Sequence, residues 1–367
     1  MPQLRPGAME APAAATIKFV VSPGLDVLNA LYFTFLAGEY EGVGAWPIET
    51  HARLDAGLRD ELNALYTYPR GEPGIMGALT DVVFSRRETW GSVEAVLDFM
   101  RGLPAGGTAD PHDSGIRGLA MHALRWPCDA DGYPAGPMIA QPSRDSFAEI
   151  VATGDVDLDK SLALYDDPEQ VRARVMRLIR RFYDEHYRHD EQRRIPIMQR
   201  SVESRRGQER DDPQAVLDSL TQRHISCIEE AGEPYTTFIF APSVDVGAYL
   251  SCTDTPPVHG VFYPAEAATL DTEDPDERAE RMALVYKALA DPQRLRILRL
   301  LGDRELYVQE IVERTGISQS VVSRHLSFMK AVGLVSPRRQ NNMKFFSINR
   351  QMRHELRAAV DAFMPPA

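Results

Sequence analysis

The stretch that decides the fold of the C-terminal part is "GISQSVVSRHLSFMKAVGLVSPRRQNNMKFFSI", residues 316–348. Its first half has Val322, Leu326 and Met329 at helical spacing, so these side chains share one face of a predicted helix. Its second half has short apolar runs on either side of "QNN", with Val335 before it, which predicts two strands joined by a turn. A helix followed at once by such a hairpin indicates a winged helix more specifically than either element alone.

The residues just ahead of this stretch predict further helices. "ERMALVYKALA" has helical periodicity, and "DPQRLRILRLLG" begins with Asp291 as N-cap and Pro292 at the first helical position. "YVQEIVERTG" ends at Gly316, which suits the left-handed conformation that follows many helices. The next helix restarts with Ser318 available as its N-cap. Together these elements predict a winged helix-turn-helix.

The face opposite the apolar stripe of the last helix is suited to nucleic acid. Short hydroxyls and one guanidinium let a helix enter the major groove, where Arg pairs with guanine and Ser or Gln reaches base edges and phosphates. The basic hairpin suits phosphate or minor-groove contact. The predicted DNA contacts are Ser318, Gln319, Ser320, Ser323, Arg324, His325, Ser327, Arg338, Arg339 and Lys344. The alternatives are a solvent-facing helix in a bundle and, for His325, packing at the edge of the buried face.

The charge distribution separates two parts of the chain. The 367 residues have a net charge of −12. Residues 281–360 hold 15 Lys and Arg against 6 Asp and Glu, whereas the remainder holds 26 against 47. A basic module on an acidic body indicates a DNA-binding domain attached to a regulatory domain, with a chance basic surface as the alternative.

The composition indicates a globular protein of the cytoplasm. Hydrophobic residues make up 44% of the chain, and three cysteines are widely scattered, which does not suit a disulfide framework. The N-terminus has no apolar run that would serve as a signal peptide, and no stretch is long and apolar enough to span a bilayer. We therefore expect a cytoplasmic protein without a membrane partner.

The predicted fold class is mainly α with small β elements. "LDTEDPDERAE", residues 270–280, is acidic and contains a Pro, as linkers do. It is predicted to separate a mostly helical sensor or regulatory domain, residues 1–269, from a winged helix-turn-helix DNA-binding and dimerisation domain, residues 281–367. Within the first domain, "IKFVVS", "TTFIFA" and "HGVFYP" predict short strands. Helices are predicted from Pro23 through "LDVLNALYFTFLAG", and over about 48–66, 92–102, 114–126, 145–153, 167–206 and 212–232.

The C-terminal module resembles the ArsR-type winged helix-turn-helix regulators over about residues 279–363. The segments "LADPQRLRIL", "GISQSVVSRHL" and "GLV" carry this resemblance. It implies a homodimer on a partly palindromic double-stranded DNA operator, acting most often as a repressor released by an effector. Such dimers use the flanking helices, which here have apolar stripes; the alternative is that the last stripe packs on the N-terminal domain. The predicted dimerisation residues are Met282, Val285, Leu289, Met352, Leu356, Val360 and Phe363.

The metal sites of such regulators do not match this sequence. "ELYVQ" has Tyr307 and Gln309 where metal-sensing members have cysteines, and the last helix offers only His354 and Glu355. The first domain resembles an uncharacterised helical domain that precedes ArsR-type modules, through "FVVSPGLDVLNAL", "FYDEHYRHDEQRRIPIMQRSVE", "IFAPSVDVGAYL" and "HGVFYP". We expect it to respond to an effector, for which a small molecule is a candidate, and we assign no cofactor.

Two sets of residues in the first domain are weak metal-ligand candidates. In "DEHYRHDE", His186 and Asp190 lie one helical turn apart, as do Glu185 and His189, although a solvated charged face is commoner. The second set has ligand types that suit zinc but no standard spacing, and buried cysteines usually belong to a core. It consists of His224, Cys227, Cys252 and His259.

Three classes of function remain open at this point. The first is a dimeric, sequence-specific transcription regulator whose N-terminal domain responds to an effector. The resemblance to ArsR-type regulators implies that it acts as a repressor. The second is an enzyme fused to a DNA-binding module, which the absence of G-x-S-x-G, Walker and H-E-x-x-H motifs disfavours. The third is an N-terminal domain controlled by a protein partner. The sequence favours the first.

Overall fold

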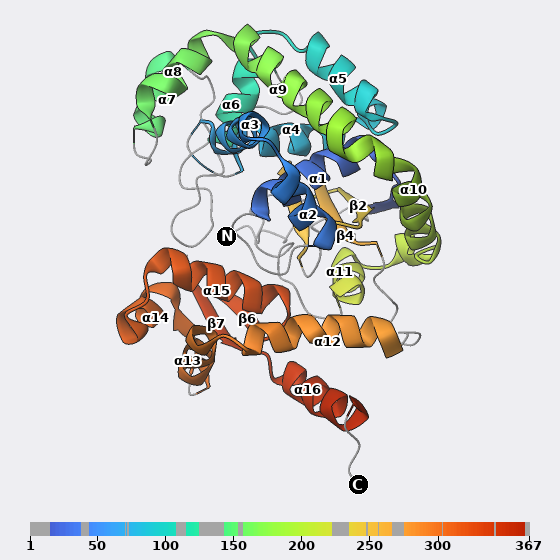
Figure 1. The fold of residues 1–367 in the computed structure, drawn as a ribbon, viewed down its shortest axis with the longest axis vertical. Helices are drawn as coiled ribbons and strands as arrows, with labels where there is room; N and C mark the ends of the chain where they lie inside the picture. Colours follow the sequence, from blue (N-terminus) through green and yellow to red (C-terminus); the bar gives the residue numbers. More distant parts are fainter. Residues whose placement is uncertain are drawn as a thin grey trace, which may run out of the picture.

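The computed structural model of the chain is mainly helical with a few strands, as the sequence predicts. In Figure 1 the N-terminal helices and strands form one body, and the winged helix forms a second body below it. Each body has a hydrophobic core of its own. Among the helices of the described residues, none is long and apolar enough to cross a membrane. The structure describes residues 15–37, 44–69, 71, 73–107, 115–124, 143–152, 157–221, 235–246, 249–255, 257–265, 275–302, 304–340 and 343–363.

A four-stranded sheet joins the two ends of the N-terminal domain. The strand order is β1-β2-β4-β3, in which β1, β2 and β4 are parallel and β3 is antiparallel to β4. Parallel neighbours need a crossover connection, and here the helices of the domain supply it between β1 and β2. The strands are β1 (Thr16–Phe19), β2 (Thr237–Ser243), β3 (Ser251–Thr255) and β4 (Val258–Pro264). The three predicted strands are confirmed, and β3 is an additional one.

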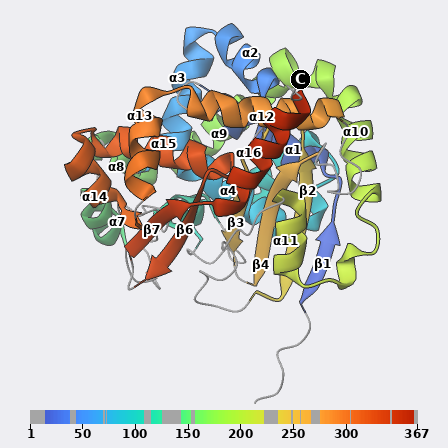
Figure 2. The same cartoon turned by 90° about the horizontal axis from the view of Figure 1, so that it is seen from below.

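Both faces of this sheet are buried. Ile239 and Ala241 of β2 belong to the large core shared with the helices, whereas Phe238 and Phe240 belong to a smaller core shared with α11 (Pro213–Thr221). Successive side chains of a strand point to opposite faces, so "FIFA" is apolar throughout because neither face meets water. Figure 2 shows α11 alongside β4.

Most of the remaining helices of the N-terminal domain surround the large core on the other face of the sheet. The remaining helices are α1 (Pro23–Leu36), α2 (Ala45–Arg53), α3 (Ala56–Thr67), α4 (Gly74–Ser85), α5 (Val93–Gly102), α6 (Ile116–Ala123), α7 (Arg144–Val151), α8 (Leu158–Asp166), α9 (Pro168–Phe182) and α10 (Arg188–Glu203), with short turns η1 (Arg87–Thr89) and η4 (Gln208–Arg210) and the π-helical turn η3 (Tyr183–Tyr187). Of these, α1 and α4 contact the strands on that face. The sequence did not predict α4 or α8.

Two predicted helices differ in detail from the observed ones. The helix predicted over 48–66 is split into α2 and α3, because Leu54 is extended and the Asp55 carboxylate accepts a hydrogen bond from the Leu58 N–H at 3.1 Å, which begins a new helix. The long helix predicted from Asp167 contains a π-helical turn between α9 and α10. A π turn adds a residue to the helical spacing, so residues on either side of it no longer face each other as in an α-helix.

The C-terminal module is a winged helix-turn-helix. Its sheet has the order β5-β7-β6. The two-residue strand β5 was not predicted, and α12 begins at Pro275, inside the segment predicted as linker. The elements are α12 (Pro275–Leu289), α13 (Pro292–Leu301), β5 (Leu306–Tyr307), α14 (Val308–Thr315), α15 (Gln319–Ala331), β6 (Val335–Gln340), β7 (Met343–Ile348) and α16 (Arg350–Phe363).

The predicted helix boundaries of the module follow from capping residues. The Asp291 carboxylate accepts hydrogen bonds from the Gln293 and Arg294 N–H groups at 2.8 and 2.9 Å, which fixes the start of α13. Gly316 has φ of +69°, the left-handed conformation that ends α14 and turns the chain into α15. Both features were predicted from the sequence and are confirmed.

Candidate nucleic-acid interface

Helix α15 separates its side chains as its periodicity predicts. Val322, Leu326 and Met329 are at most 1% exposed and belong to the core of the module. The side chains of Gln319, Ser320, Arg324 and Ser327 are exposed on the opposite face, and Ser323 is half-buried beside them. The core packing therefore holds this polar face outward and fixes its orientation relative to the turn.

The beginning of α15 leaves its first turn accessible. Ser318 occupies the N-cap position, but its side chain caps no backbone N–H; its Oγ lies 3.4 Å from Ser320 Oγ instead. The first N–H groups of a helix have no partner within the helix and point towards the helix N-terminus. A helix end of this kind suits a DNA phosphate, because the helix dipole and these N–H groups both favour an anion there.

His325 contacts the preceding helix. Its Nε2 lies 2.9 Å from Oε1 of Gln293, in the first turn of α13, and its ring is half-buried. Because Nε2 donates to the amide oxygen in the tautomer that makes this bond, the imidazole joins the two helices on the protein side. Among the predicted DNA contacts, His325 is thus the one whose ring is already engaged in packing α15 on α13.

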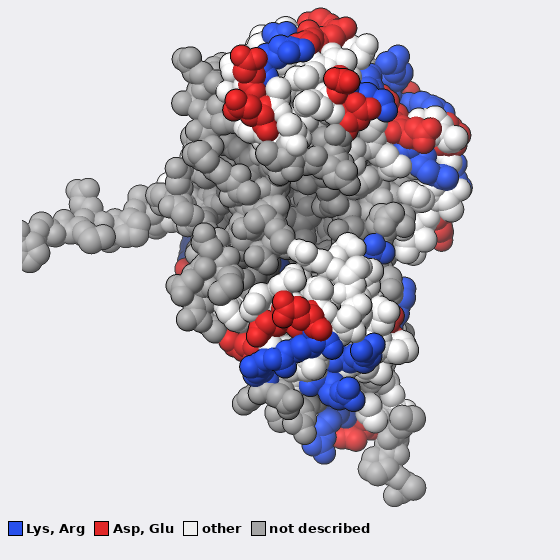
Figure 3. All heavy atoms as spheres, turned by 90° about the vertical axis from the view of Figure 1, so that its left-hand side faces the viewer, with Lys and Arg blue, Asp and Glu red and all other residues white. Residues whose placement is uncertain are grey.

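The wing places its basic residues next to the turn. In the β6–β7 register Arg338 pairs with Phe345, and Arg339 pairs with Lys344. The turn residues 341–342 lie outside the described residues, as do the side chains of Arg338, Arg339 and Lys344. The backbone register alone gathers three basic residues at the tip of one hairpin. Figure 3 shows Lys and Arg side chains over much of the lower body, where the winged helix lies, beside a smaller acidic group.

The structure divides the predicted dimerisation residues. Met282, Val285 and Met352 are at most 5% exposed in the core of their own module, and Leu289 and Leu356 pack partly against that core. Val360 and Phe363, near the end of α16, are 39% and 46% exposed. Leu295 of α13, which was not predicted, is another large apolar side chain that remains exposed. An apolar contact with a second copy would therefore involve the far end of α16 first.

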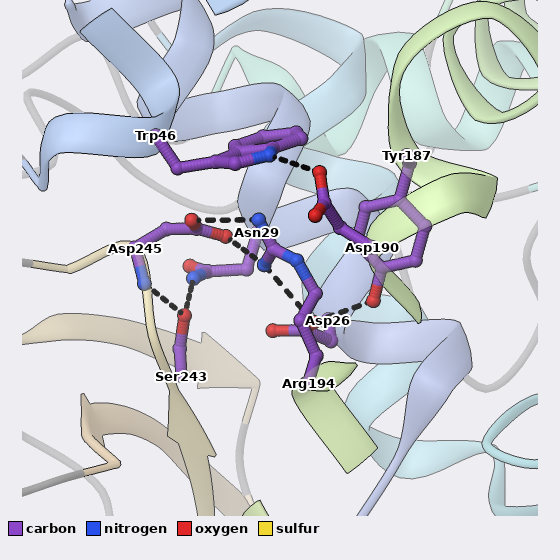
Figure 4. A network of polar contacts seen from close by, with 8 residues as sticks. All are labelled: Asp26, Asn29, Trp46, Tyr187, Asp190, Arg194, Ser243 and Asp245. Carbon is purple, nitrogen blue, oxygen red and sulfur yellow. Dashed lines mark hydrogen bonds and ion pairs between the residues drawn. The ribbon is translucent and has the colours of Figure 1, made fainter. Parts of the chain in front are cut away.

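A buried polar cluster lies where β2 ends, and the sequence did not predict it. Arg194 of α10 forms a forked ion pair with Asp245, with N–O distances of 2.5 and 2.9 Å, and its Nη1 also lies 3.3 Å from Oδ2 of Asp26 of α1. Tyr187 donates to the same oxygen of Asp26 at 2.5 Å. Figure 4 shows these side chains converging from α1, η3, α10 and the segment after β2. The one sequence signal was a pair of polar residues, Asp26 and Asn29, inside the apolar "LDVLNAL".

Aromatic rings and hydroxyls complete this cluster. The guanidinium carbon of Arg194 lies 4.2 Å from the centroid of the Trp46 ring and 4.9 Å from that of Tyr187. The Asn29 amide donates to Ser243 Oγ at 2.7 Å. Burial raises the pKa of Tyr187 well above its ordinary value, and the neighbouring Asp26 adds to this effect. The hydroxyl thus remains a hydrogen-bond donor at any physiological pH.

The metal-ligand candidates do not assemble into a site. Within the part of the chain that the structure describes, no group of three His, Cys, Asp or Glu side chains is arranged to hold a metal. Asp190, which was paired with His186 by spacing, accepts a hydrogen bond from Trp46 Nε1 at 2.6 Å, and burial lowers the pKa of His186. His189 is exposed. His224 and Cys227 lie outside the described residues.

The two described members of the second candidate set, Cys252 and His259, lie in the sheet of the N-terminal domain. His259 of β4 is buried, with its ring centroid 4.8 Å from that of Tyr235, so it packs as an aromatic side chain. Cys252 lies opposite Val261 in the sheet register, and His259 lies opposite Asp254. The sheet therefore positions Cys252 and His259 on neighbouring strands, and His259 lies among aromatic rings.

Comparison with known proteins identifies the C-terminal module. Residues 291–336 match the family described as bacterial regulatory protein, arsR family. The chain is 31% identical over 84 residues to the transcriptional activator HlyU of Vibrio cholerae, covering 23% of this chain and 78% of that protein. It is 41% identical over 86 residues to the "Probable mercury resistance operon repressor" of Streptomyces lividans, covering 23% of this chain and 69% of that protein.

A solved structure gives a match of similar extent. NolR from Sinorhizobium fredii is 33% identical, with a TM-score of 0.22, and the alignment covers 26% of this chain and 98% of NolR. All these matches cover about a quarter of the chain, so they concern the module and leave the larger N-terminal domain without an assigned relative. The sequence matches agree with the helix-turn-helix, the wing and the exposed polar face of α15. The chain belongs to the arsR family of bacterial regulatory proteins and is a DNA-binding transcription regulator.

Proposed function

We propose that this regulator binds a specific operator as a homodimer and that its N-terminal domain controls this binding in response to an effector. The observation that carries the proposal is the polar face of α15. Gln319, Ser320, Arg324 and Ser327 are exposed together, while the opposite face is fixed in the core. Side chains of these types read base edges in the major groove.

Dimerisation is supported by the end of α16. Among the described side chains of α16, Val360 and Phe363 are large apolar residues that the core of the module leaves exposed. A single recognition helix contacts few bases, and two-fold pairing places two such helices in half-sites about 34 Å apart. A contact between the α16 helices of two copies would cover these side chains and would set that spacing.

The experiment that tests specific binding is fluorescence anisotropy with DNA from upstream of the protein's own gene. The full chain and residues 275–367 are each titrated against random competitor DNA. We expect both to discriminate, which would support a repressor that an effector releases. Binding by the fragment alone would indicate that the N-terminal domain holds the module off DNA. No discrimination by either protein would contradict the α15 assignment.

The experiment that tests dimerisation is sedimentation equilibrium of Val360→Asp and of a control, Asp361→Asn, whose altered side chain is exposed on the same helix. An aspartate at position 360 would bring like charges together in a two-fold contact and would bury them. We expect the wild type and Asp361→Asn to be dimers and Val360→Asp to be a monomer with weaker operator binding. A dimeric Val360→Asp protein would exclude this end of α16 from the interface.

A further inference from the structure

The buried cluster after β2 has one negative charge more than it has positive charges. Asp26, Arg194 and Asp245 are each at most 3% exposed. A single guanidinium is thus shared between two carboxylates, and its fork is used by Asp245. Asp190 lies nearby but is only half-buried and is bound by Trp46. A buried charge without a counter-charge is unfavourable because the low-dielectric interior does not solvate it.

Two oxygens of the cluster also lack hydrogen-bond donors. In the described part of the chain, Oδ1 of Asp26 and Oδ1 of Asn29 are buried and have no hydrogen-bond partner. The two residues are one turn apart on α1, so their side chains emerge on the same side of the helix. The Asn29 amide nitrogen is turned to Ser243. In Figure 4 the free oxygen of Asp26 points away from Tyr187, towards the side of Ser243.

We propose that this cluster binds one compact cation that carries hydrogen-bond donors, of the ammonium class, between Asp26 and Asn29. Such a group supplies the missing positive charge and donates to both free oxygens. Water would supply donors without the charge. An alkali cation would need more oxygen ligands than these two to replace its hydration shell, whereas an ammonium group is satisfied by donating to the few acceptors present. The proposal deepens the proposed function, on which it rests for its link to DNA binding: the cation is the effector or the charged head of one.

The path to the DNA-binding module runs along the segment after β2. The Asp245 N–H donates to Ser243 Oγ at 3.1 Å, the same hydroxyl that binds Asn29, and the Asp245 carbonyl accepts from the Gly44 N–H at 3.2 Å. Tyr249, four residues further on, packs against the core of the N-terminal domain and also against the core of the winged helix. Asp245 therefore lies four residues from a side chain that contacts both bodies, so a change in the bonds of Asp245 can reach the winged helix through Tyr249.

Protonation competes with the cation. Burial, together with the charges of Asp26 and Asp190, raises the pKa of Asp245 to about 6 against the lowering effect of Arg194. Tyr187 of η3 is the other titratable group that faces the cluster, and it stays protonated. A carboxyl whose pKa is raised in the folded state binds a proton as the pH falls through 6. Below that pH Asp245 is protonated, the cluster has no surplus negative charge, and the cation binds less favourably.

The first experiment is thermal unfolding of the full chain at pH 8 and pH 5 in sodium, potassium, ammonium and methylammonium chloride at equal concentration. At pH 8, and at an ammonium concentration ten times its Kd, we expect Tm to be about 2–4 °C higher in ammonium chloride than in sodium chloride. This size of shift is the one expected for a protein of this length. We expect the shift to disappear at pH 5 and potassium to behave as sodium does. No ammonium-specific shift at pH 8, or an equal shift with potassium, would overturn the proposal.

A variant localises the effect. Asp26→Asn removes the surplus charge with almost no change in shape, so we expect it to lose the ammonium shift. Asp60→Asn, on the exposed side of α3, is the matched control and should keep it. An ammonium shift that persists in a folded Asp26→Asn protein would overturn the site. If this variant does not fold, the pH 5 measurement on the wild type decides instead, because persistence there would equally overturn it.

Operator binding separates this inference from the proposed function. We expect the Kd for the operator to differ at least threefold between ammonium and sodium chloride of equal concentration in the wild type and in Asp60→Asn, but not in Asp26→Asn. If the chain does not bind DNA specifically, the proposed function fails while the unfolding data still judge the cation site. If DNA binding is specific but ammonium changes neither Tm nor Kd, the cation site alone fails.

Discussion

Two arginines, one in each body of the molecule, are equally buried, with 3% of each exposed. Arg294 in the winged helix donates to the carbonyl oxygens of Ala288 and Lys287 at 2.8 and 3.0 Å and lies over the Phe328 ring. Arg194 in the N-terminal domain is held by two carboxylates. The two carbonyl bonds and the ring contact of Arg294 join α13 to α12 and α15. The arrangement around Arg194 depends on a balance of buried charges.

This difference indicates that the two bodies differ in their sensitivity to pH and to bound cations. Carbonyl acceptors do not titrate, so the bonds of Arg294 to Ala288 and Lys287 are kept at any physiological pH. Carboxylates gain and lose protons, so the surroundings of Arg194 respond to pH and to bound cations. We infer that the winged helix presents a constant DNA-binding surface and that the N-terminal domain is the part built to change.

The largest expected effect is that of Arg194→Met. It leaves two buried carboxylates without a counter-charge, and we expect the free energy of unfolding of the N-terminal domain to fall by about 3–5 kcal/mol. All three tryptophans lie before residue 275, so urea denaturation followed by tryptophan fluorescence reports on this domain alone. Arg193→Met, at an exposed neighbouring position, is the control. If Arg194→Met lowers the free energy of unfolding no more than Arg193→Met does, the contrast drawn between Arg194 and Arg294 is wrong.

Arg294→Met should have a smaller effect on its own body. It removes hydrogen bonds to two carbonyls and leaves them short of donors, which lowers the free energy of unfolding by about 1–3 kcal/mol. Urea denaturation of residues 275–367 followed by circular dichroism measures this, with the exposed Arg299→Met as control. A loss as large as that of Arg194→Met would mean that the two arginines do not differ as described.

Arg324→Ala tests the constant DNA-binding surface. The side chain is exposed on α15, and we expect its removal to weaken specific binding by about 1–3 kcal/mol while binding to random DNA changes little. Fluorescence anisotropy with operator and random duplexes gives both values, and circular dichroism shows whether the fold is kept. Unchanged operator affinity would remove α15 from the base-reading role.

Arg338→Ala should have the smallest and least selective effect. Its position at the base of the wing tip suits a phosphate contact, so we expect operator and random DNA to lose affinity alike. The slope of log K against log salt concentration should fall by about 1. A loss confined to the operator would instead assign the wing a base-reading role.

The sequence predicts the winged helix far better than the N-terminal domain, for a physical reason. The capping by Asp291, the left-handed Gly316 and the apolar face of α15 all depend on residues a few positions apart. Only β5 was missed, because two residues carry no periodicity. In the N-terminal domain, Arg194 and its partners Asp245 and Asp26 are 51 and 168 residues apart.

The same reason explains the elements that were missed. Arg194 follows a charged run that is typical of a solvated helix face, and nothing local indicates its burial. Strand β3, "SCTDT", has a single apolar residue and forms because β4 pairs with it. His186 and Asp190 were only a weak metal-ligand candidate by spacing; in the structure His186 lies in the π-helical turn and Asp190 accepts a hydrogen bond from Trp46.

The pairing of β1 with β2 has a consequence for how the chain is made. Thr16 pairs with Thr237, so the first strand leaves the ribosome long before its partner exists. At about 5–20 residues per second, the intervening helices have on the order of ten seconds or more to form before the sheet can close. The winged helix is synthesised afterwards, and its short-range contacts favour fast folding. A newborn molecule therefore completes its N-terminal domain before it acquires the means to bind DNA.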